Sequence, residues 1–202
     1  MALKLGEFLI GVFGSKYIAV LFVSMFPLIE LKGAIPIGMS EAFKMGLLET
    51  AVISYLGSTV VSVGLYFLLI PVFNLLKKIK FVKGIVEKIE GIFKKKAEKI
   101  ALKTNTSALD EARRIMMISL FAFVAVPFPV TGVWTGTAIA VFLNLKFKES
   151  VLPIALGNLV AGTIITLLTY LFKGYVDYII YGLLAVAVIM LIVFIVKVAK
   201  EK

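Results

Sequence analysis

The sequence contains no cysteine and no histidine. Ser-His-Asp and Cys-His nucleophilic sites, zinc sites built on imidazole or thiolate, and histidine-ligated haem each need at least one of these residues. No Walker-type phosphate-binding loop occurs either, which excludes a nucleotide-driven motor of that type. The remaining acid-base groups near neutral pH are carboxylates, and they form no clustered acidic motif. We therefore expect no enzyme, no catalytic residue, no metal site and no cofactor.

Charge is also scarce, at 17% of residues, whereas 61% are hydrophobic. A soluble chain of this composition would expose far more apolar surface than it could bury. Three runs, 51–73, 151–172 and 178–196, contain no charged residue, and about 20 apolar residues suffice to cross a hydrocarbon core of about 30 Å. The sequence predicts an all-α integral membrane protein in which these runs are transmembrane helices.

Two further apolar stretches do not fit a simple span. Residues 1–14 are interrupted by Glu7 and predict a short helix at the membrane interface. The uncharged stretch 115–145 is too long for one span and too short for two. Residues that break helices lie in its middle: Pro127, Pro129, Gly132 and Gly136. We predict a re-entrant hairpin that turns near the midplane; five spans without re-entrance are the alternative.

The broken stretch has a counterpart one hundred residues earlier, "PLIELKGAIPIG" at 27–38. Shifting the sequence by that distance aligns Pro27 with Pro127, Glu49 with Glu149, Leu56 with Leu156, Gly57 with Gly157 and Val60 with Val160. Each copy reads as a broken apolar hairpin, an acidic residue and then a span, which indicates an internal repeat.

Both spans of the repeat carry small or polar residues at helical spacing, namely Ser54, Ser58 and Ser62 in the first and Asn158, Gly162 and Thr166 in the second. One interpretation is close helix packing. The other is the lining of a polar pathway, for which Ser58 and Asn158 are the candidates.

The segment 77–114 carries more than half of the 22 Lys and Arg residues, which indicates a cytoplasmic side. Counting spans outward from this connector places the C-terminus on the same side and makes the two hairpins enter from opposite faces. Apolar residues from Ile79 to Ile100 recur at helical spacing, so we expect an amphipathic helix on anionic headgroups, with merely solvated charge as the alternative. No aromatic residues interleave with the lysines in a nucleic-acid-binding pattern, and we expect no nucleic-acid partner.

The expected fold is two inverted repeats, each a re-entrant helical hairpin followed by a transmembrane helix, plus the basic amphipathic connector helix and a C-terminal transmembrane helix. The single membrane domain, 1–202, divides into an interfacial helix (1–14), repeat 1 (15–76), the basic cytoplasmic connector (77–114), repeat 2 (115–173) and the C-terminal helix (174–202). Broken helices of inverted repeats that meet near the midplane are typical of transporters.

The paired motifs "PLIELKGAIPIG" and "VPFPVTGVWTGTAIA" resemble those of the small multidrug export proteins, a membrane family grouped with the DedA-like (VTT-domain) superfamily. The resemblance implies two oppositely facing re-entrant hairpins and a transport role, for lipid phosphates such as polyprenyl phosphate in the DedA-like relatives, with proton coupling. One feature departs from the DedA-like pattern, which places arginines in and beside the second hairpin. Here that hairpin has none, and Arg113 and Arg114 precede it, so an arginine clamp for phosphate lacks its residues there.

Glu30 and Lys32 lie inside the first hairpin, where an isolated carboxylate is costly unless it pairs, takes up a proton or faces water. Residues two apart do not share a helix face, so pairing requires a non-helical tip, which Gly33 and Pro36 suggest. Glu30 is then either a carboxylate that alternates between proton and substrate or a member of a structural ion pair that fixes the hairpin.

The other candidate site residues surround the two hairpin tips. Backbone and hydroxyl donors to a phosphate or carboxylate are expected from Gly33, Gly38, Gly132, Gly136, Thr131 and Thr135, although the glycines could serve the turns alone. Pro36, Pro127 and Pro129 complete the predicted substrate- or proton-binding set. Trp134 is either an interface anchor or a plug between the hairpins.

We expect a multi-pass protein of the plasma membrane that acts as a secondary transporter or flippase for an amphiphile, either a lipid phosphate or a small drug-like compound. Its expected partners are membrane lipids, anionic headgroups at the connector and the amphiphilic substrate, and a homodimer is left open. The alternative is a non-transporting scaffold that binds anionic lipid or partners through the connector.

Overall fold

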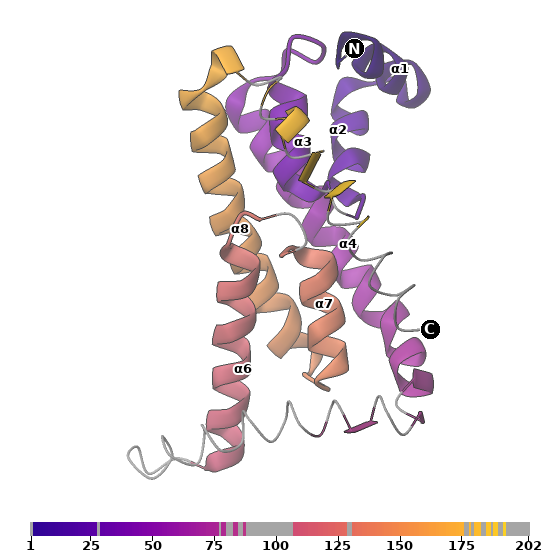
Figure 1. Cartoon of the computed structure of the whole chain (residues 1–202), viewed down its shortest axis with the longest axis vertical. Coiled ribbons are helices and arrows are strands. Elements are labelled where there is room, and N and C mark those ends of the chain that lie inside the picture. Colours follow the sequence, from indigo (N-terminus) through magenta and orange to yellow (C-terminus); the bar gives the residue numbers. More distant parts are fainter. Residues whose placement is uncertain are drawn as a thin grey trace.

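In the computed structural model the described residues are 2–27, 29–76, 78–79, 83–84, 87, 107–128, 131–175, 178, 180–182, 185–186, 188–189 and 192. Every regular element among these residues is helical (Figure 1). Most of the predicted connector helix and of the predicted span 178–196, together with Pro129, lies outside the described residues.

Two long helices, α4 (Leu47–Leu76) and α8 (Phe147–Leu171), are long and apolar enough to cross a membrane. They confirm the predicted spans 51–73 and 151–172. At about 1.5 Å per residue both exceed a hydrocarbon core of about 30 Å. The chain is therefore a helical membrane protein with two such helices among its described residues, or three when the bent pair α1 and α2 is counted as one span.

Three shorter helices reach only part of that distance. These are α2 (Lys16–Met25), α3 (Glu30–Met39) and α7 (Val133–Phe142), each of 10 residues. Such a helix extends about 15 Å, half of a hydrocarbon core. In Figure 1, α2 descends from one end of the molecule and α3 returns toward that end. These two helices form the first hairpin.

The second hairpin has the opposite direction. Helix α6 (Ala108–Ala125) rises from the other end of the molecule, the chain turns near the middle, and α7 returns toward the end from which α6 came (Figure 1). The predicted break therefore lies where the proline- and glycine-rich sequence placed it. Helix α6 begins seven residues before the uncharged stretch, because the Ser107 hydroxyl accepts a hydrogen bond from the Asp110 amide and caps its first turn.

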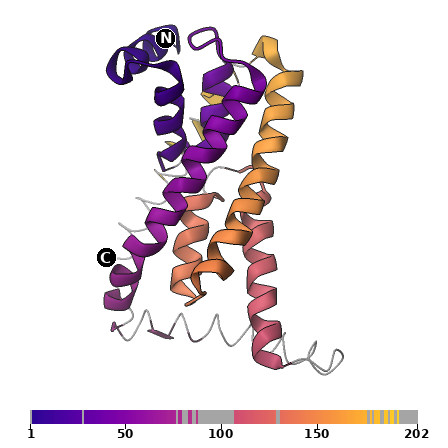
Figure 2. The same ribbon diagram turned by 180° about the vertical axis from the view of Figure 1, so that it is seen from behind.

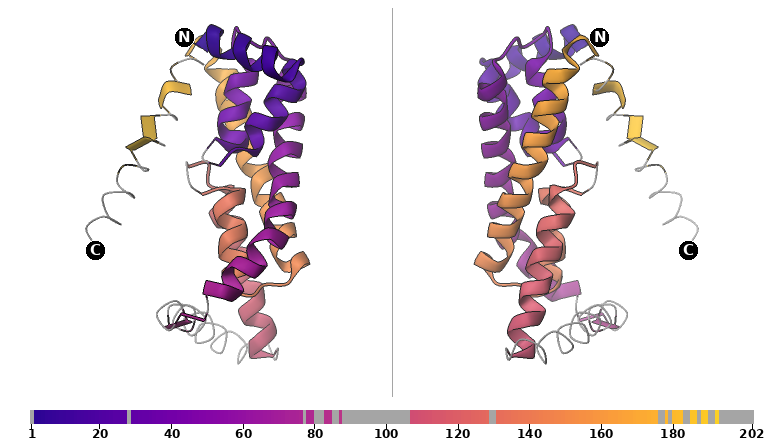
Figure 3. Two further views of the ribbon diagram at one scale, coloured as in Figure 1. Left: turned by 90° about the vertical axis from the view of Figure 1, so that its right-hand side faces the viewer. Right: turned by 90° about the vertical axis from the view of Figure 1, so that its left-hand side faces the viewer.

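Helix α1 (Ala2–Phe13) lies across the end of the bundle (Figure 3). It meets α2 at an angle of 101°. Gly14, at the bend, has φ of 69°, a left-handed conformation that glycine adopts without a steric penalty. The predicted helix over 1–14 thus exists as a separate element; its depth relative to a bilayer stays a prediction.

Glycines allow each hairpin to pack closely on its long helix. A Cβ atom on Gly57 of α4 would lie 2.6 Å from the Leu21 carbonyl oxygen of α2, and one on Gly157 of α8 would lie 2.7 Å from the Phe121 carbonyl oxygen of α6. Any side chain at either position would force the helices apart. The seam between α4 and α8 runs along one face of the molecule (Figure 2).

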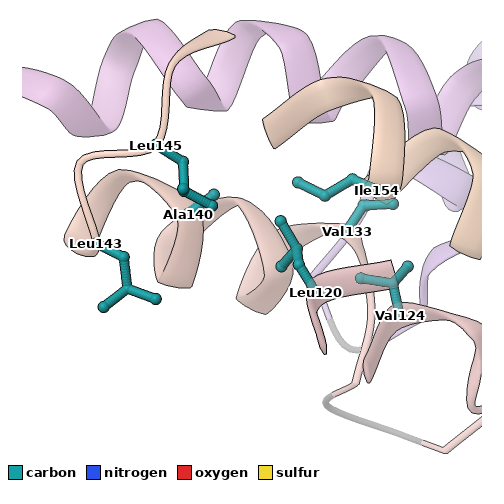
Figure 4. Close-up of a cluster of buried hydrophobic side chains, with 7 residues drawn as sticks. All are labelled: Leu120, Val124, Val133, Ala140, Leu143, Leu145 and Ile154. Atoms are coloured by element: carbon teal, nitrogen blue, oxygen red, sulfur yellow. The ribbon is translucent and has the colours of Figure 1, made fainter. Parts of the chain in front are cut away.

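The apolar core of the second half lies between α6, α7 and α8 (Figure 4). It consists of Leu120, Val124, Val133, Ala140, Leu143, Leu145 and Ile154. At the same end, the Arg113 guanidinium donates a hydrogen bond of 2.8 Å to the Glu149 carboxylate and ties the start of α6 to that of α8. In this structure the Arg113 side chain therefore joins two helices.

Candidate functional site at the junction of the hairpin tips

The site begins where the first hairpin reverses. Helix α2 ends at Met25, and α3 begins at Glu30, whose φ of 49° lies in the left-handed region that non-glycine residues rarely adopt. The prediction that Gly33 and Pro36 make the tip non-helical is wrong, since both lie within α3. The irregular backbone lies before them and at Glu30 itself. This conformation costs free energy and persists because surrounding contacts hold it.

Lys32 and Glu30 form an ion pair, with 3.7 Å between Lys32 Nζ and Glu30 Oε2. Both residues are buried, at 3% and 5% exposure. Lys32 Nζ also crosses to the second hairpin, donating hydrogen bonds of 2.8 Å to the Phe128 carbonyl oxygen and 2.7 Å to the Thr131 carbonyl oxygen. A longer hydrogen bond of 3.5 Å goes to the Thr131 hydroxyl. An ammonium group has three donors and no acceptor, so oxygens of the second hairpin account for its donors and the carboxylate balances its charge.

The Glu30 carboxylate reaches the start of α7. Its Oε1 atom accepts a hydrogen bond of 3.1 Å from the Trp134 amide, in the first turn of α7, whose N-cap residue Gly132 has no side chain to supply one. Free amides and the helix dipole favour an anion at this position. A Cβ atom on Gly132 would overlap the carboxylate, so the absence of a side chain is what admits it.

Trp134 adds another connection between the hairpins. Its indole Nε1 donates a hydrogen bond of 2.9 Å to the carbonyl oxygen of Met25, the last residue of α2. The Thr131 hydroxyl lies 2.7 Å from the Val126 carbonyl oxygen and 2.9 Å from that of Phe128, which stabilises the turn of the second hairpin. Charged and neutral hydrogen bonds therefore join the two tips in both directions.

The structure brings together five of the predicted residues, Glu30, Lys32, Thr131, Gly132 and Trp134. Pro127 is half-buried in the break before α7, Pro36 is buried within α3, and Thr135 is half-buried on α7. Three predicted glycines instead give close packing, Gly38 and Gly136 against a neighbouring helix and Gly33 against the N-cap residue of its own helix. A Cβ atom on Gly33 would approach Ile29, one on Gly38 would approach Thr50, and one on Gly136 would approach Val124.

The two pathway candidates contact each other between α4 and α8. Asn158 Nδ2 donates hydrogen bonds of 2.7 Å to Ser58 Oγ and 3.2 Å to Thr59 Oγ1. The Ser58 hydroxyl in turn donates to the Ser54 carbonyl oxygen at 2.9 Å. This contact satisfies the buried amide, and it is the geometry expected of polar residues that hold membrane helices together.

Sequence reasoning missed the acceptors and the donor that complete the site. Backbone groups complete the site, namely the carbonyl oxygens of Met25 and Phe128 and the amide of Trp134. Every residue carries a backbone carbonyl, and every residue except proline carries an amide N–H. No residue-type pattern marks them. The one available signal was the proximity of prolines and glycines to these positions, which indicated that backbone groups there would lie outside a regular helix.

A comparison with known families agrees with the fold. A family model described as "Putative small multi-drug export protein" matches residues 30–164, about two thirds of the chain. The match begins at Glu30 and includes both charged residues of the junction, the second hairpin and most of α8. No curated protein and no solved structure matches the sequence.

Proposed function

The chain belongs to the small multi-drug export protein family, and on that premise we propose that it is a secondary transporter of an amphiphilic substrate and not an enzyme. The observation that carries the proposal is the Glu30 carboxylate at the first turn of α7, beside the Lys32 ammonium. A buried carboxylate and ammonium near the middle of a membrane helix bundle are costly and mark functional sites by default.

The junction suggests how substrate and proton would exchange. The start of α7 and Lys32 together favour an anion, and Glu30 now occupies that place. When Glu30 binds a proton, its attraction for Lys32 falls, and the anionic group of a substrate takes over the amide and the ammonium. Loss of the proton restores the internal pair and releases the substrate. Transport coupled to protons follows from this competition.

We further propose that the two halves are inverted repeats. Several features recur at a shift of one hundred residues. Gly57 packs against the Leu21 carbonyl oxygen, and Gly157 packs against the Phe121 carbonyl oxygen. Lys44 and Asn144 have φ of 47° and 56°. The carboxylates of Glu49 and Glu149 accept hydrogen bonds from the amides of Gly46 and Lys146. Equivalent contacts in oppositely directed hairpins support a two-fold relation in the membrane plane.

The proposed substrate has an apolar body and one anionic group, as a lipid phosphate does. Its phosphate class follows from the resemblance to the DedA-like proteins, and a drug-like amphiphile follows from the family description. We place the protein in the plasma membrane with the connector and the C-terminus in the cytoplasm, on the charge distribution alone. Anionic lipid headgroups would contact the connector.

The test uses purified protein in liposomes, with and without a pH gradient. Transbilayer movement of a fluorescent polyprenyl phosphate is compared between wild type, Glu30→Gln and Glu41→Gln. Glu41 carries the same side chain in an exposed ion pair with Lys44, so its substitution controls for loss of charge. We expect movement that depends on the gradient in wild type and Glu41→Gln, and a loss of about a hundredfold or more in Glu30→Gln, the lower end of what one positioned proton-transfer group contributes.

A cationic dye as competing cargo separates the substrate classes. Movement of the dye alone would select the drug-export interpretation over lipid phosphate. If folded protein moves neither compound, or if Glu30→Gln moves the lipid as wild type does, the proposal is wrong. Loss of lipid binding on neutralising the connector lysines, with Glu30→Gln unaffected, would instead support the scaffold alternative.

A further inference from the structure

The seam between α4 and α8 contains a groove that the proposed exchange at Glu30 does not use. It has a volume of about 380 Å³. Its walls come from the first part of α4 and the second part of α8, including Leu48, Val52, Tyr55, Leu159, Thr163 and Leu167. The Thr163 hydroxyl is bonded to the Leu159 carbonyl oxygen of its own helix at 2.9 Å, which leaves the groove almost wholly apolar.

The length of the groove matches half of a bilayer. It extends over residues 47–55 of α4 and 159–170 of α8, which at 1.5 Å per residue is about 12 and about 17 Å. One leaflet contributes about 15 Å of a hydrocarbon core of about 30 Å. Both walls belong to helices that are long and apolar enough to span the membrane, so in a bilayer the lipid tails of one leaflet would have access to the groove.

The other half of the same seam is closed. The rings of Phe67 and Phe147 stack at 5.3 Å between centroids, and Tyr66 packs edge-on against Phe147 at 5.4 Å. The Tyr66 hydroxyl donates a hydrogen bond of 2.9 Å to the Leu145 carbonyl oxygen. Two crossing helices therefore need not leave a groove between them, since aromatic side chains fill the corresponding half of this seam.

We propose that the α4–α8 groove binds one hydrocarbon chain of a membrane lipid, from the leaflet at the α1 end of the molecule. An acyl chain fits the apolar lining, the length of one leaflet and the lateral opening. The volume falls in the range of about 300 to 1,000 Å³ that is usual for ligand sites. This inference does not depend on proton exchange at Glu30, because no residue of the junction lines the groove.

The test is photo-crosslinking with phosphatidylglycerol that carries a diazirine in one acyl chain. Wild-type protein in liposomes is irradiated, and adducts are located by mass spectrometry. We expect adducts on 47–55 and 159–170 to exceed those on the residues shifted by one hundred, 147–155 and 59–70, by about tenfold, the factor expected of a specific site with about 1.4 kcal/mol of additional affinity.

Matched substitutions test whether the groove itself is responsible. Thr163→Trp and Ala51→Phe fill the groove, whereas Val63→Trp and Val151→Phe place the same side chains at the shifted positions. The first two should remove most adducts and the last two should not. Adduct density that is equal in both halves, or that survives filling of the groove, would overturn the proposal as ordinary contact with bulk lipid. So would disulfide-linked dimers of Thr163→Cys formed in place of lipid adducts, because a second copy would then be the occupant.

The transport variant Glu30→Gln makes the outcomes separable. Glu30→Gln should keep the adducts in the groove while it loses gradient-driven movement. If transport depends on Glu30 but the groove shows no preference for the acyl chain, only the present inference fails. If the adducts appear while no transport is found, only the proposed function fails.

Discussion

Asn158 donates a hydrogen bond of 2.7 Å to Ser58, the residue one hundred positions earlier in the chain. In the proposed inverted repeat, two residues at equivalent places contact each other only near the axis that relates the halves. This bond therefore marks the centre of the seam between α4 and α8. On one side of it the seam is open as the α4–α8 groove, and on the other it is closed by Tyr66, Phe67 and Phe147.

Replacing Asn158 by leucine should separate packing from a pathway role. Hydrogen bonds between membrane helices contribute about 0.6 kcal/mol on average and up to about 1.7 kcal/mol. Ser58 keeps its bond to the Ser54 carbonyl oxygen, so we expect a loss of only about 1 kcal/mol. The measurement is reversible unfolding in mixed detergent micelles, with exposed Asn74→Leu as control. Unchanged stability with abolished transport would favour pathway lining over packing.

Replacing Lys32 by methionine should destabilise the protein strongly. The substitution leaves the buried Glu30 carboxylate without its cation, and breaking a buried pair in this way costs about 3–5 kcal/mol. The double variant Lys32→Met/Glu30→Gln should recover part of that loss, which the same unfolding measurement detects. Lys44→Met removes a cation from an exposed pair and should cost less than about 1 kcal/mol. Additive effects at positions 30 and 32 would contradict a direct interaction.

Replacing Gly132 by alanine should displace the Glu30 carboxylate, because the new Cβ atom would overlap it. Overpacking of this kind costs about 1–3 kcal/mol. Gly64→Ala is the matched control, since nothing lies within 4 Å of a Cβ atom there. In a Glu30→Ala background the cost of Gly132→Ala should largely disappear. If it persists, the clash lies elsewhere and the close approach of the hairpins is not its cause.

The two hairpins make a clear prediction for accessibility in this cysteine-free chain. Single cysteines at Ser15 and Lys44 flank the first hairpin and should react with a membrane-impermeant maleimide from one face. Cysteines at Ser107 and Asn144 flank the second and should react from the opposite face. Vesicles of both orientations distinguish the faces. Labelling of Ser107→Cys and Asn144→Cys from different faces would show that α6 and α7 cross the membrane and would favour five spans.

Much of the architecture was predictable because it depends on uninterrupted apolar length. The spans α4 and α8 have no competing interpretation, and the break before α7 follows from Pro127 and Gly132. The first tip was misplaced because Gly33 and Pro36 usually interrupt helices. In α3, Pro36 is the seventh residue, and the helix continues past it. Tertiary packing around the buried α3 outweighed the local preference.

The sequence predicted the charged residues of the candidate site but not the backbone groups that they bind. Glu30 and Lys32 are conspicuous in an apolar stretch, and their pairing was one of the alternatives that the sequence left open. Their bonds to the Trp134 amide and the Phe128 carbonyl oxygen depend on how two hairpins meet, which residue types do not encode. The sequence singled out Gly132 as a residue that breaks helices, whereas its importance in the structure is the space that it leaves for a carboxylate.

The distance along the chain between the two hairpins has a consequence for biosynthesis. Glu30 and Trp134 are 104 residues apart, so the first hairpin is made long before its partner exists. At about 5–20 residues per second, a ribosome needs about 5–20 s to reach the second tip. During that interval the carboxylate and ammonium have no backbone groups from the second hairpin to bind. The first hairpin should therefore settle in the bilayer only after the second has left the translocation machinery.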